Sequence, residues 1–190
     1  MRIISGKFRG RKLTDSLHLK KTLRPTTDMA REALFNILFS AKSLKEIGFQ
    51  IVGSDILDVC CGSGAVAFEA LSRGANSAVL IDNNREHLEL AKKNAELLGI
   101  ISEAKFLQLD VRKLPQNEKF FDLVFIDPPY REDYLLIVSS LLEKNWIQKK
   151  SLIIIEFETT NNLSEISKML NKVEIRSYGS TSFGFFTGRL

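Results

Sequence analysis

The alternation of short apolar runs with helix-length segments from residue 54 onward most constrains how this chain can fold. Runs rich in β-branched and other apolar residues predict strands at 54–61, 77–82, 104–110, 121–127 and 151–158. The intervening patterns predict helices at 65–74, 85–99, 134–145 and near 163–170. This alternation predicts a mostly parallel sheet with helices on both faces. Two last runs, 172–179 and 182–188, predict an antiparallel pair at its edge.

Length and composition limit the class of protein. The 190 residues suffice for one domain with its own core. No apolar run approaches the ~20 residues that span a bilayer, and the N-terminus lacks the apolar region of a secretory signal, so we expect a cytoplasmic protein without a membrane segment. The cysteines, Cys60 and Cys61, are adjacent and exclude a disulfide framework, and two distant histidines argue against a zinc site; we expect no metal.

Positive charge is concentrated near the N-terminus. Residues 1–31 hold nine Lys and Arg against two Asp, a net charge of +7, whereas the whole chain carries +4. Strand-like runs flank Arg9-Gly10 and predict a hairpin, which we take with its connector as an arm over 1–25, before a domain over 26–190 that opens with a helix near 28–41. Such an arm is typical of a polyanion binder, although a solvated basic strand has the same composition.

A glycine turn follows the first strand, in the stretch DVCCGSGAVA, residues 58–67. Gly62 and Gly64 allow a tight turn and a close approach of ligand to backbone, and the next helix directs its N-terminus at that ligand. Residues 62–67 fit the G-x-G-x-x-G/A pattern, and Asp82 ends the next strand where it can accept hydrogen bonds from ribose. NAD and S-adenosylmethionine both satisfy this pattern; an empty structural turn is the alternative.

Acidic residues lie at the ends of four predicted strands: Asp58, Asp82, Asp110 and Asp127. Asp58 can approach a cationic amino group, as in the methionine part of S-adenosylmethionine, or can accept bonds from the loop backbone. Asp110 can serve an adenine amino group or cap the next segment. Because open α/β sheets bind ligands at the carboxyl ends of their strands, we expect all four to share one rim.

The turn Asp127-Pro128-Pro129-Tyr130 suits methyl transfer to an exocyclic amine. The Asp127 carboxylate and the carbonyl of Pro128 or Pro129 can accept the amine N–H groups and direct its lone pair, while the prolines hold these acceptors in place. The carboxylate also stabilises the positive charge that develops during attack. Tyr130 can stack on an extruded base. A rigid turn with a packed tyrosine is the alternative.

Four segments of the chain carry a family resemblance: MRIISGKFRGRKL, LRPTTDMAREALFNIL, CGSGAVAFEALSRGA and FIDPPY. Together they resemble the bacterial 16S rRNA (guanine(966)-N2)-methyltransferase family, within the class I S-adenosylmethionine-dependent methyltransferases, and the similarity extends to the final SFGFF run. The resemblance implies a Rossmann-like, mostly parallel seven-stranded sheet with an antiparallel C-terminal strand and an N-terminal β-hairpin arm. It also implies S-adenosylmethionine as cofactor, with S-adenosylhomocysteine as product, and the N2 amine of a guanine in 16S rRNA of an assembled small subunit as substrate.

The resemblance also assigns residues. It places the methionine part of the cofactor at the glycine turn, ribose at Asp82, adenine at Asp110, the guanine amine at residues 127–130, and the loop 24–27 beside the active site. The expected cofactor contacts are Asp58, Cys60, Gly62, Gly64, Asp82, Asn83, Asp110 and Val111. The expected rRNA contacts are Arg2, Lys7, Arg9, Arg11, Lys12, Arg24 and Thr26. This chain departs from the family pattern at Cys60-Cys61, where a Phe-Ala-like pair is expected, and at Asn83-Asn84.

Three other functions fit part of the pattern. A DNA adenine or cytosine amino-methyltransferase needs a target-recognition region, for which the chain leaves no room. An NAD-dependent oxidoreductase explains the glycine turn but gives residues 127–130 and the basic arm no role. A non-catalytic RNA-binding assembly factor would not need an intact glycine turn and Asp-Pro-Pro-Tyr turn. We expect a monomer without an obligate protein partner.

Overall fold

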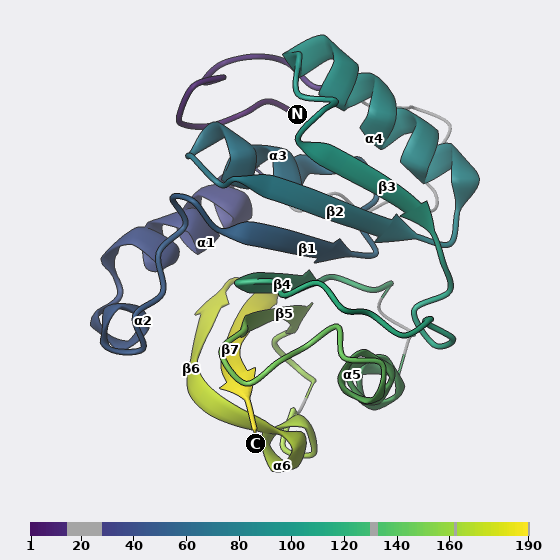
Figure 1. Ribbon diagram of the computed structural model, residues 1–190. Helices are drawn as coiled ribbons and strands as arrows, with labels where there is room; N and C mark the ends of the chain where they lie inside the picture. Colours follow the sequence, from purple (N-terminus) through teal and green to yellow (C-terminus); the bar gives the residue numbers. More distant parts are fainter. Residues whose placement is uncertain (15–27, 130–132, 162, 190) are drawn as a thin grey trace.

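The computed structural model describes residues 1–14, 28–129, 133–161 and 163–189. Within these residues, seven strands form one sheet in the order β3-β2-β1-β4-β5-β7-β6 (Figure 1). β3, β2, β1, β4 and β5 are parallel, and β7 runs antiparallel to both β5 and β6. This arrangement confirms the predicted mostly parallel sheet with an antiparallel C-terminal strand.

From residue 28 onward, the predicted strands and helices are present, with small differences at their ends. The strands are β1 Asp55–Val59, β2 Ser77–Asp82, β3 Ala104–Gln108, β4 Leu123–Ile126, β5 Leu152–Glu158, β6 Leu170–Tyr178 and β7 Thr181–Gly188. The helices are α1 Asp28–Ser40, α2 Lys42–Glu46, α3 Ala65–Ser72, α4 Arg85–Leu98, α5 Tyr134–Glu143 and α6 Ile166–Met169. The short helix α2, five residues long, was not predicted because it is too short to show a helical period. Over the described residues, no helix combines the length and apolar character needed to cross a bilayer.

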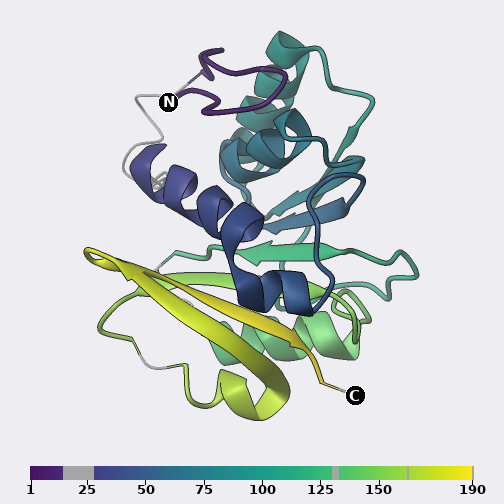
Figure 2. The ribbon, with the colours of Figure 1, turned by 90° about the vertical axis from the view of Figure 1, so that its left-hand side faces the viewer.

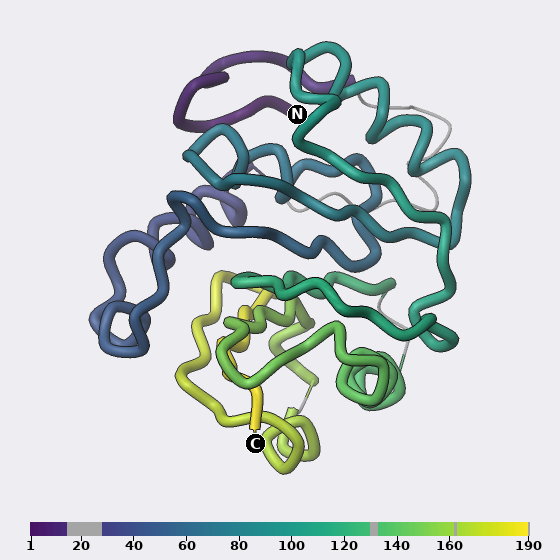
Figure 3. The backbone as a smooth tube through the Cα atoms, in the orientation of Figure 1, coloured from purple at the N-terminus to yellow at the C-terminus, as the bar shows by residue number. Residues whose placement is uncertain are grey.

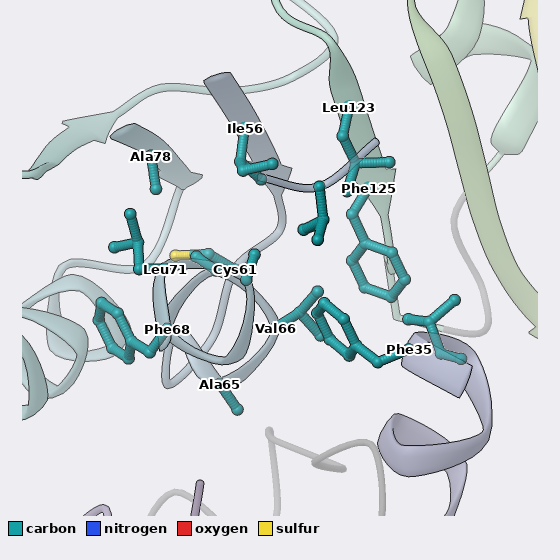
Figure 4. Packing of buried hydrophobic residues seen from close by; sticks show 14 of the residues in the cluster. Phe35, Ile56, Cys61, Ala65, Val66, Phe68, Leu71, Ala78, Leu123 and Phe125 are labelled. Atoms are coloured by element: carbon teal, nitrogen blue, oxygen red, sulfur yellow. The ribbon is translucent and has the colours of Figure 1, made fainter. Parts of the chain in front are cut away.

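Two hydrophobic cores lie on opposite faces of the sheet, because successive strand side chains point to opposite faces. Ile56 of β1 belongs to the core beneath α1, α3 and α4, whereas Leu57 belongs to the core beneath α5 and α6. In the first core, Phe35 of α1, Val66 of α3 and Phe125 of β4 gather (Figure 4). Burying a side chain such as Phe stabilises the fold by about 1.5–3 kcal/mol, so these contacts fix α3, and the glycine turn before it, on the sheet.

The N-terminal segment, residues 1–14, packs on the domain surface near α3 and α4 (Figures 2 and 3). Its predicted hairpin is present in a short form: Arg2 and Lys12 make an antiparallel bridge, Ile3 N donates to Arg11 O at 2.9 Å, and Leu13 N donates to Met1 O at 3.1 Å. The segment docks on α3, where Lys7 N donates to Ser72 O at 2.7 Å and a Cβ at Gly6 would lie 1.9 Å from that oxygen. The proposed boundary between residues 25 and 26 lies outside the described residues.

Candidate active site

The strands β3, β2, β1 and β4 are neighbours, and their carboxyl ends lie side by side along one rim of the sheet (Figure 1). Asp82 is the last residue of β2, and Asp127 directly follows β4. Val59 of β1 pairs with Ile126 of β4, and Asp127 N donates to Val59 O at 3.3 Å. The structure therefore places Asp127 beside the start of the glycine turn, on the rim predicted from the sequence.

The glycine turn has a conformation that its sequence requires. Gly62 and Gly64 have φ values of 53° and 76°, in the left-handed region that favours glycine. A Cβ at Gly64 would lie 2.5 Å from the Phe68 ring and 2.9 Å from Leu80, so a larger residue does not fit. Cys61 N donates to Ile81 O at 3.0 Å, which ties the turn to β2.

Cys60, at the start of this turn, has a φ of 62° although it is not glycine. Such a conformation costs on the order of 1–3 kcal/mol and is common at binding sites. Cys60 is half-buried at the mouth, consistent in position with the cofactor contact expected there. Cys61 is buried, and its burial, with the nearby carboxylates Asp58 and Asp82, raises the pKa of the thiol well above its usual value.

Asp58 lies under the N-terminus of α3. It is 2% exposed, and its Oδ2 accepts a hydrogen bond from Ala67 N at 3.2 Å. Burial raises the pKa of the Asp58 carboxyl to about 8, the bond from Ala67 opposes that rise, and the charge of Asp82 adds to it. A cation placed against this carboxyl would favour its ionised form, which is the chemistry expected for a cofactor amino group.

Asp82 braces the glycine turn against α4. Its Oδ2 accepts a hydrogen bond from Gly62 N at 3.0 Å and lies 3.2 Å from His87 Nδ1, while its Oδ1 accepts from Asn84 N at 2.9 Å. Asn84 in turn caps α4 through a bond from Glu86 N. A carboxylate has about four acceptor positions, so these bonds leave capacity for a ribose hydroxyl.

The residues predicted to meet adenine occupy different environments. Asp110 follows β3 and pairs with Arg112 through both oxygens, at 2.9 and 3.0 Å; the hydrogen bonds from Arg112 lower the pKa of Asp110. Val111 is buried in the core beneath α5 and α6. Asn83 is exposed, and its backbone oxygen accepts from Gln108 Nε2. An adenine amino group at Asp110 would share that carboxylate with Arg112.

The Asp-Pro-Pro-Tyr turn lies at the mouth of the sheet. Asp127 is half-buried, Pro128 is buried and Pro129 is exposed. Tyr130 lies outside the described residues, as do Arg24 and Thr26, so their predicted contacts stay predictions. Helix α5 follows at once, and Asp133 caps it by accepting from Leu135 N at 2.9 Å.

The basic residues predicted to meet rRNA in the described part of the arm are exposed: Arg2, Lys7, Arg9, Arg11 and Lys12. Arg2 lies 3.9 Å from Asp28 of α1, and both Lys7 and Arg11 lie over the Phe8 ring. The tip of the segment contacts Ser72 at the end of α3, about 12 Å from the glycine turn given eight helical residues. The basic surface therefore extends away from the rim along α3.

Two polar residues of α4 at this site were not singled out from the sequence. His87 contacts Asp82, and Asn94 is fully buried, with its side-chain amide donating to Ser63 O at 3.2 Å. Both lie on the apolar face of α4, with Leu88, Ala91 and Leu98. A buried polar side chain requires partners, so their place in the helical period could have marked them.

A separate cavity of about 820 Å³ opens at the opposite end of the strands, where β4 and β5 begin. Its lining includes Phe120, Ile147, Gln148, Lys149 and Arg189. It lies away from the glycine turn and the four acidic residues. In the ranges that the structure describes, no group of three or more His, Cys, Asp or Glu could hold a metal ion.

Sequence comparison assigns the chain to a family. The family described as Conserved hypothetical protein 95 matches residues 1–187. The chain belongs to this family. The match covers the N-terminal segment, the glycine turn and the Asp-Pro-Pro-Tyr turn together, so the proposed site lies wholly within the family region.

Curated relatives and solved structures support the same placement. Ribosomal RNA small subunit methyltransferase D of Escherichia coli is 38% identical over 169 residues, which cover 87% of this chain and 79% of that protein. The Haemophilus influenzae protein of the same name is 37% identical over 163 residues, covering 83% and 79%. The solved structure of E. coli yhhF matches with a TM-score of 0.81 at 31% identity, covering 100% of this chain and 98% of that one. These findings confirm the family resemblance and the Rossmann-like class I methyltransferase fold.

Proposed function

We propose that the protein transfers a methyl group from S-adenosylmethionine to the exocyclic N2 amine of a guanine in small-subunit rRNA. One observation carries most of the proposal: Asp127 follows the strand beside the glycine turn, its amide bonded to Val59 O at 3.3 Å. Methyl donor and amine acceptor would therefore meet at adjacent strand ends. The rRNA class is supported by relatives named Ribosomal RNA small subunit methyltransferase D.

The residues at the rim fit this cofactor. The glycine turn, with Gly62 and Gly64 at φ values of 53° and 76°, precedes the N-terminus of α3, where backbone N–H groups can face a ligand. Asp82 retains acceptor capacity for ribose, and Asp58 is a buried carboxyl that a cationic amino group would ionise. When bound, the cofactor supplies an electrophilic methyl group on a sulfonium.

Asp127 and the proline carbonyls would perform the positioning. The Asp127 carboxylate and the Pro128 carbonyl accept the two N–H groups of the amine, which directs its lone pair toward the methyl carbon. With the cofactor bound, the amine would displace S-adenosylhomocysteine from the methyl carbon, and the Asp127 carboxylate would stabilise the positive charge that develops on nitrogen. The proton would then pass from the methylated amine to water, so no strong general base is required.

The exposed basic side chains of the N-terminal segment, including Lys7, Arg9 and Lys12, would contact rRNA phosphates. Such contacts position the substrate without reading its sequence. Selection of one guanine then depends on the shape of the folded rRNA, which favours an assembled small subunit over naked RNA as substrate. We place this activity in the cytoplasm and assign it to a monomer.

Tritiated S-adenosylmethionine tests the proposal directly. Purified protein should label 30S subunits from a strain that lacks this gene, and mass spectrometry should locate one N2-methylguanosine that the strain otherwise misses. Calorimetry should detect S-adenosylhomocysteine and not NADH. Absence of label on subunits, naked 16S rRNA and DNA alike, or binding of NADH instead, would reject the assignment.

A further inference from the structure

Asn94 of α4 joins the N-terminal segment to the glycine turn. Its Oδ1 accepts from Thr14 N at 2.7 Å, and its Nδ2 donates to Thr14 O at 3.3 Å and to Ser63 O at 3.2 Å. The side chain is fully buried. One amide therefore satisfies both backbone groups of Thr14 and one carbonyl between the two glycines.

At the glycine turn, this contact completes the fixation of one peptide unit. The Ser63 carbonyl accepts from Asn94, and the amide of the same peptide, Gly64 N, donates to Cys61 O at 2.8 Å. Gly64 on one side of that peptide allows it to rotate more readily than another residue would. Asn94 thus holds the orientation of the backbone that, in the proposed function, faces the cofactor.

At the N-terminal segment, the same contact fixes Thr14, which precedes the connector; the family resemblance places only the loop 24–27, further along, beside the active site. The tip of the segment is held independently: Phe8 N donates to Ser72 Oγ at 3.0 Å, and Ser72 Oγ donates to Ser5 O at 2.6 Å. Ser72 contacts no residue of the glycine turn among its hydrogen-bond partners. The two anchors therefore differ in one respect, because Asn94 alone of this pair also touches Ser63.

We propose that Asn94 is a positioning residue that couples the two sites, so that a cofactor on the glycine turn strengthens rRNA binding by the N-terminal segment. The inference rests on the proposed function. Because the Ser63 carbonyl and the Thr14 backbone share one buried amide, ordering either partner restricts the amide and lowers the entropic cost of ordering the other. Coupling of this kind is reciprocal, so rRNA would strengthen cofactor binding by the same factor.

The test measures the dissociation constant of unmethylated 30S subunits with and without saturating S-adenosylhomocysteine. For the wild-type protein we expect the product to tighten binding by about 5-fold or more. Asn94→Ala should bring this ratio close to 1, although Met1 Sδ, 3.8 Å from Ser63 Oγ, is another contact between the segment and the turn. Ser72→Ala is the matched control: it loosens the segment and weakens 30S binding with or without the product, but should leave the ratio at its wild-type value.

Hydrogen exchange on the wild-type protein gives a second reading that needs no variant to fold. Saturating S-adenosylhomocysteine alone should slow hydrogen exchange of the Thr14 amide, which donates a hydrogen bond to Asn94 Oδ1. The exchange rate of the Phe8 amide, which donates to Ser72 Oγ, should stay the same. The inference is overturned if the wild-type protein binds both partners with a ratio of 1, if Asn94→Ala keeps the ratio, or if Thr14 exchange does not respond. Failure of the wild-type protein to bind either partner instead removes the proposed function.

Discussion

Asp58 is the carboxyl whose environment differs most from water, and it makes stability depend on pH. Its pKa is about 8 in the fold, against an ordinary value of 3.8, so between these values the folded state binds more protons than the unfolded state. Stability from this residue is present below pH ~4 and is lost as pH rises through about 8, by on the order of a few kcal/mol.

Asp58→Asn should abolish that decline, since the amide keeps an acceptor for Ala67 N and does not ionise. Urea denaturation at intervals between pH 4 and 9 measures it. Asp110→Asn is the control of opposite sign: hydrogen bonds from Arg112 lower the pKa of Asp110, so its contribution is lost only as pH falls through that lowered value. Parallel stability curves for the wild-type protein and Asp58→Asn would contradict the raised pKa.

Cofactor affinity should follow the same carboxyl. If the amino group of S-adenosylhomocysteine meets Asp58, it binds the ionised form, so affinity should rise from pH 6 to pH 8 and then level off, with a proton released below about pH 8. Calorimetry in two buffers of different ionisation enthalpy measures that proton. Asp58→Asn should bind more weakly and release none; an equal proton release from this variant assigns the proton to another group.

Asp127 belongs to the acceptor side of the proposed site. Asp127→Ala should abolish methyl transfer to 30S subunits, because the amine loses an N–H acceptor and a stabilising charge. The substitution removes no proposed cofactor contact, so the dissociation constant of S-adenosylhomocysteine should change by less than about 3-fold. A tenfold change would correspond to a loss of about 1.4 kcal/mol of binding free energy. Loss of transfer and cofactor binding together would move Asp127 to the cofactor side.

At the scale of elements, a buried carboxylate joins the N-terminal segment, α1 and α3. Glu69 is fully buried and accepts from Ile4 N at 2.8 Å and Ser5 N at 3.0 Å, and it pairs with Arg73 at 2.7 Å. The Arg31 guanidinium, also fully buried, lies 3.8 Å away and donates to Asp28. Breaking one partner of such a cluster leaves charge buried without its counterpart.

Glu69→Gln should therefore lower the free energy of unfolding by about 3 kcal/mol, read from urea denaturation with unchanged slope. The matched control is Glu89→Gln on α4, which removes the Arg85–Glu89 pair of the same (i,i+4) spacing on an exposed surface, where the cost is below about 0.5 kcal/mol. Equal effects of the two substitutions would show that burial of Glu69 contributes nothing.

The sequence predicted an element well where hydrophobic periodicity or a turn residue determines it. It predicted an element less well where contacts with distant residues determine its conformation. The buried apolar runs of β1 and β4, separated by helix-length segments, and the glycine turn at 62–64 indicate the sheet and the shared rim. The hairpin within 1–14 is present with fewer paired residues than predicted, and the sequence did not show where it docks, because its contacts with Ser72 and Asn94 join residues far apart in sequence. Asn94 was missed for the same reason: the helical period places it inside but does not name its partners.

At the scale of the whole molecule, two sets among the basic groups of the described residues differ in their distance from the rim: those of the N-terminal segment beside α3, and Lys149 and Lys150 in the cavity where β4 and β5 begin. Only the first adjoins the rim that holds Asp58, Asp82 and Asp127. A substrate that reaches Asp127 can therefore lie along the N-terminal segment, while the lysines at the other end of the strands face away from it. Net charge alone does not distinguish these surfaces, but the salt dependence of binding does.

Replacing both Arg9 and Lys12 with alanine should weaken 30S binding and lower the slope of log affinity against log salt by about one per lost phosphate contact, hence about two. Fluorescence titrations between 50 and 300 mM potassium chloride measure that slope. Above 0.1 M salt the Debye length is about 10 Å or less, so distant charges contribute little. Lys149→Ala with Lys150→Ala removes the same charge at the opposite end of the strands and should leave the slope unchanged. Both double substitutions change the net charge equally. A slope that falls in both variants would therefore show that overall charge, not local contact, attracts the rRNA. A slope that falls only in the Lys149 and Lys150 variant would place the rRNA at that end of the sheet.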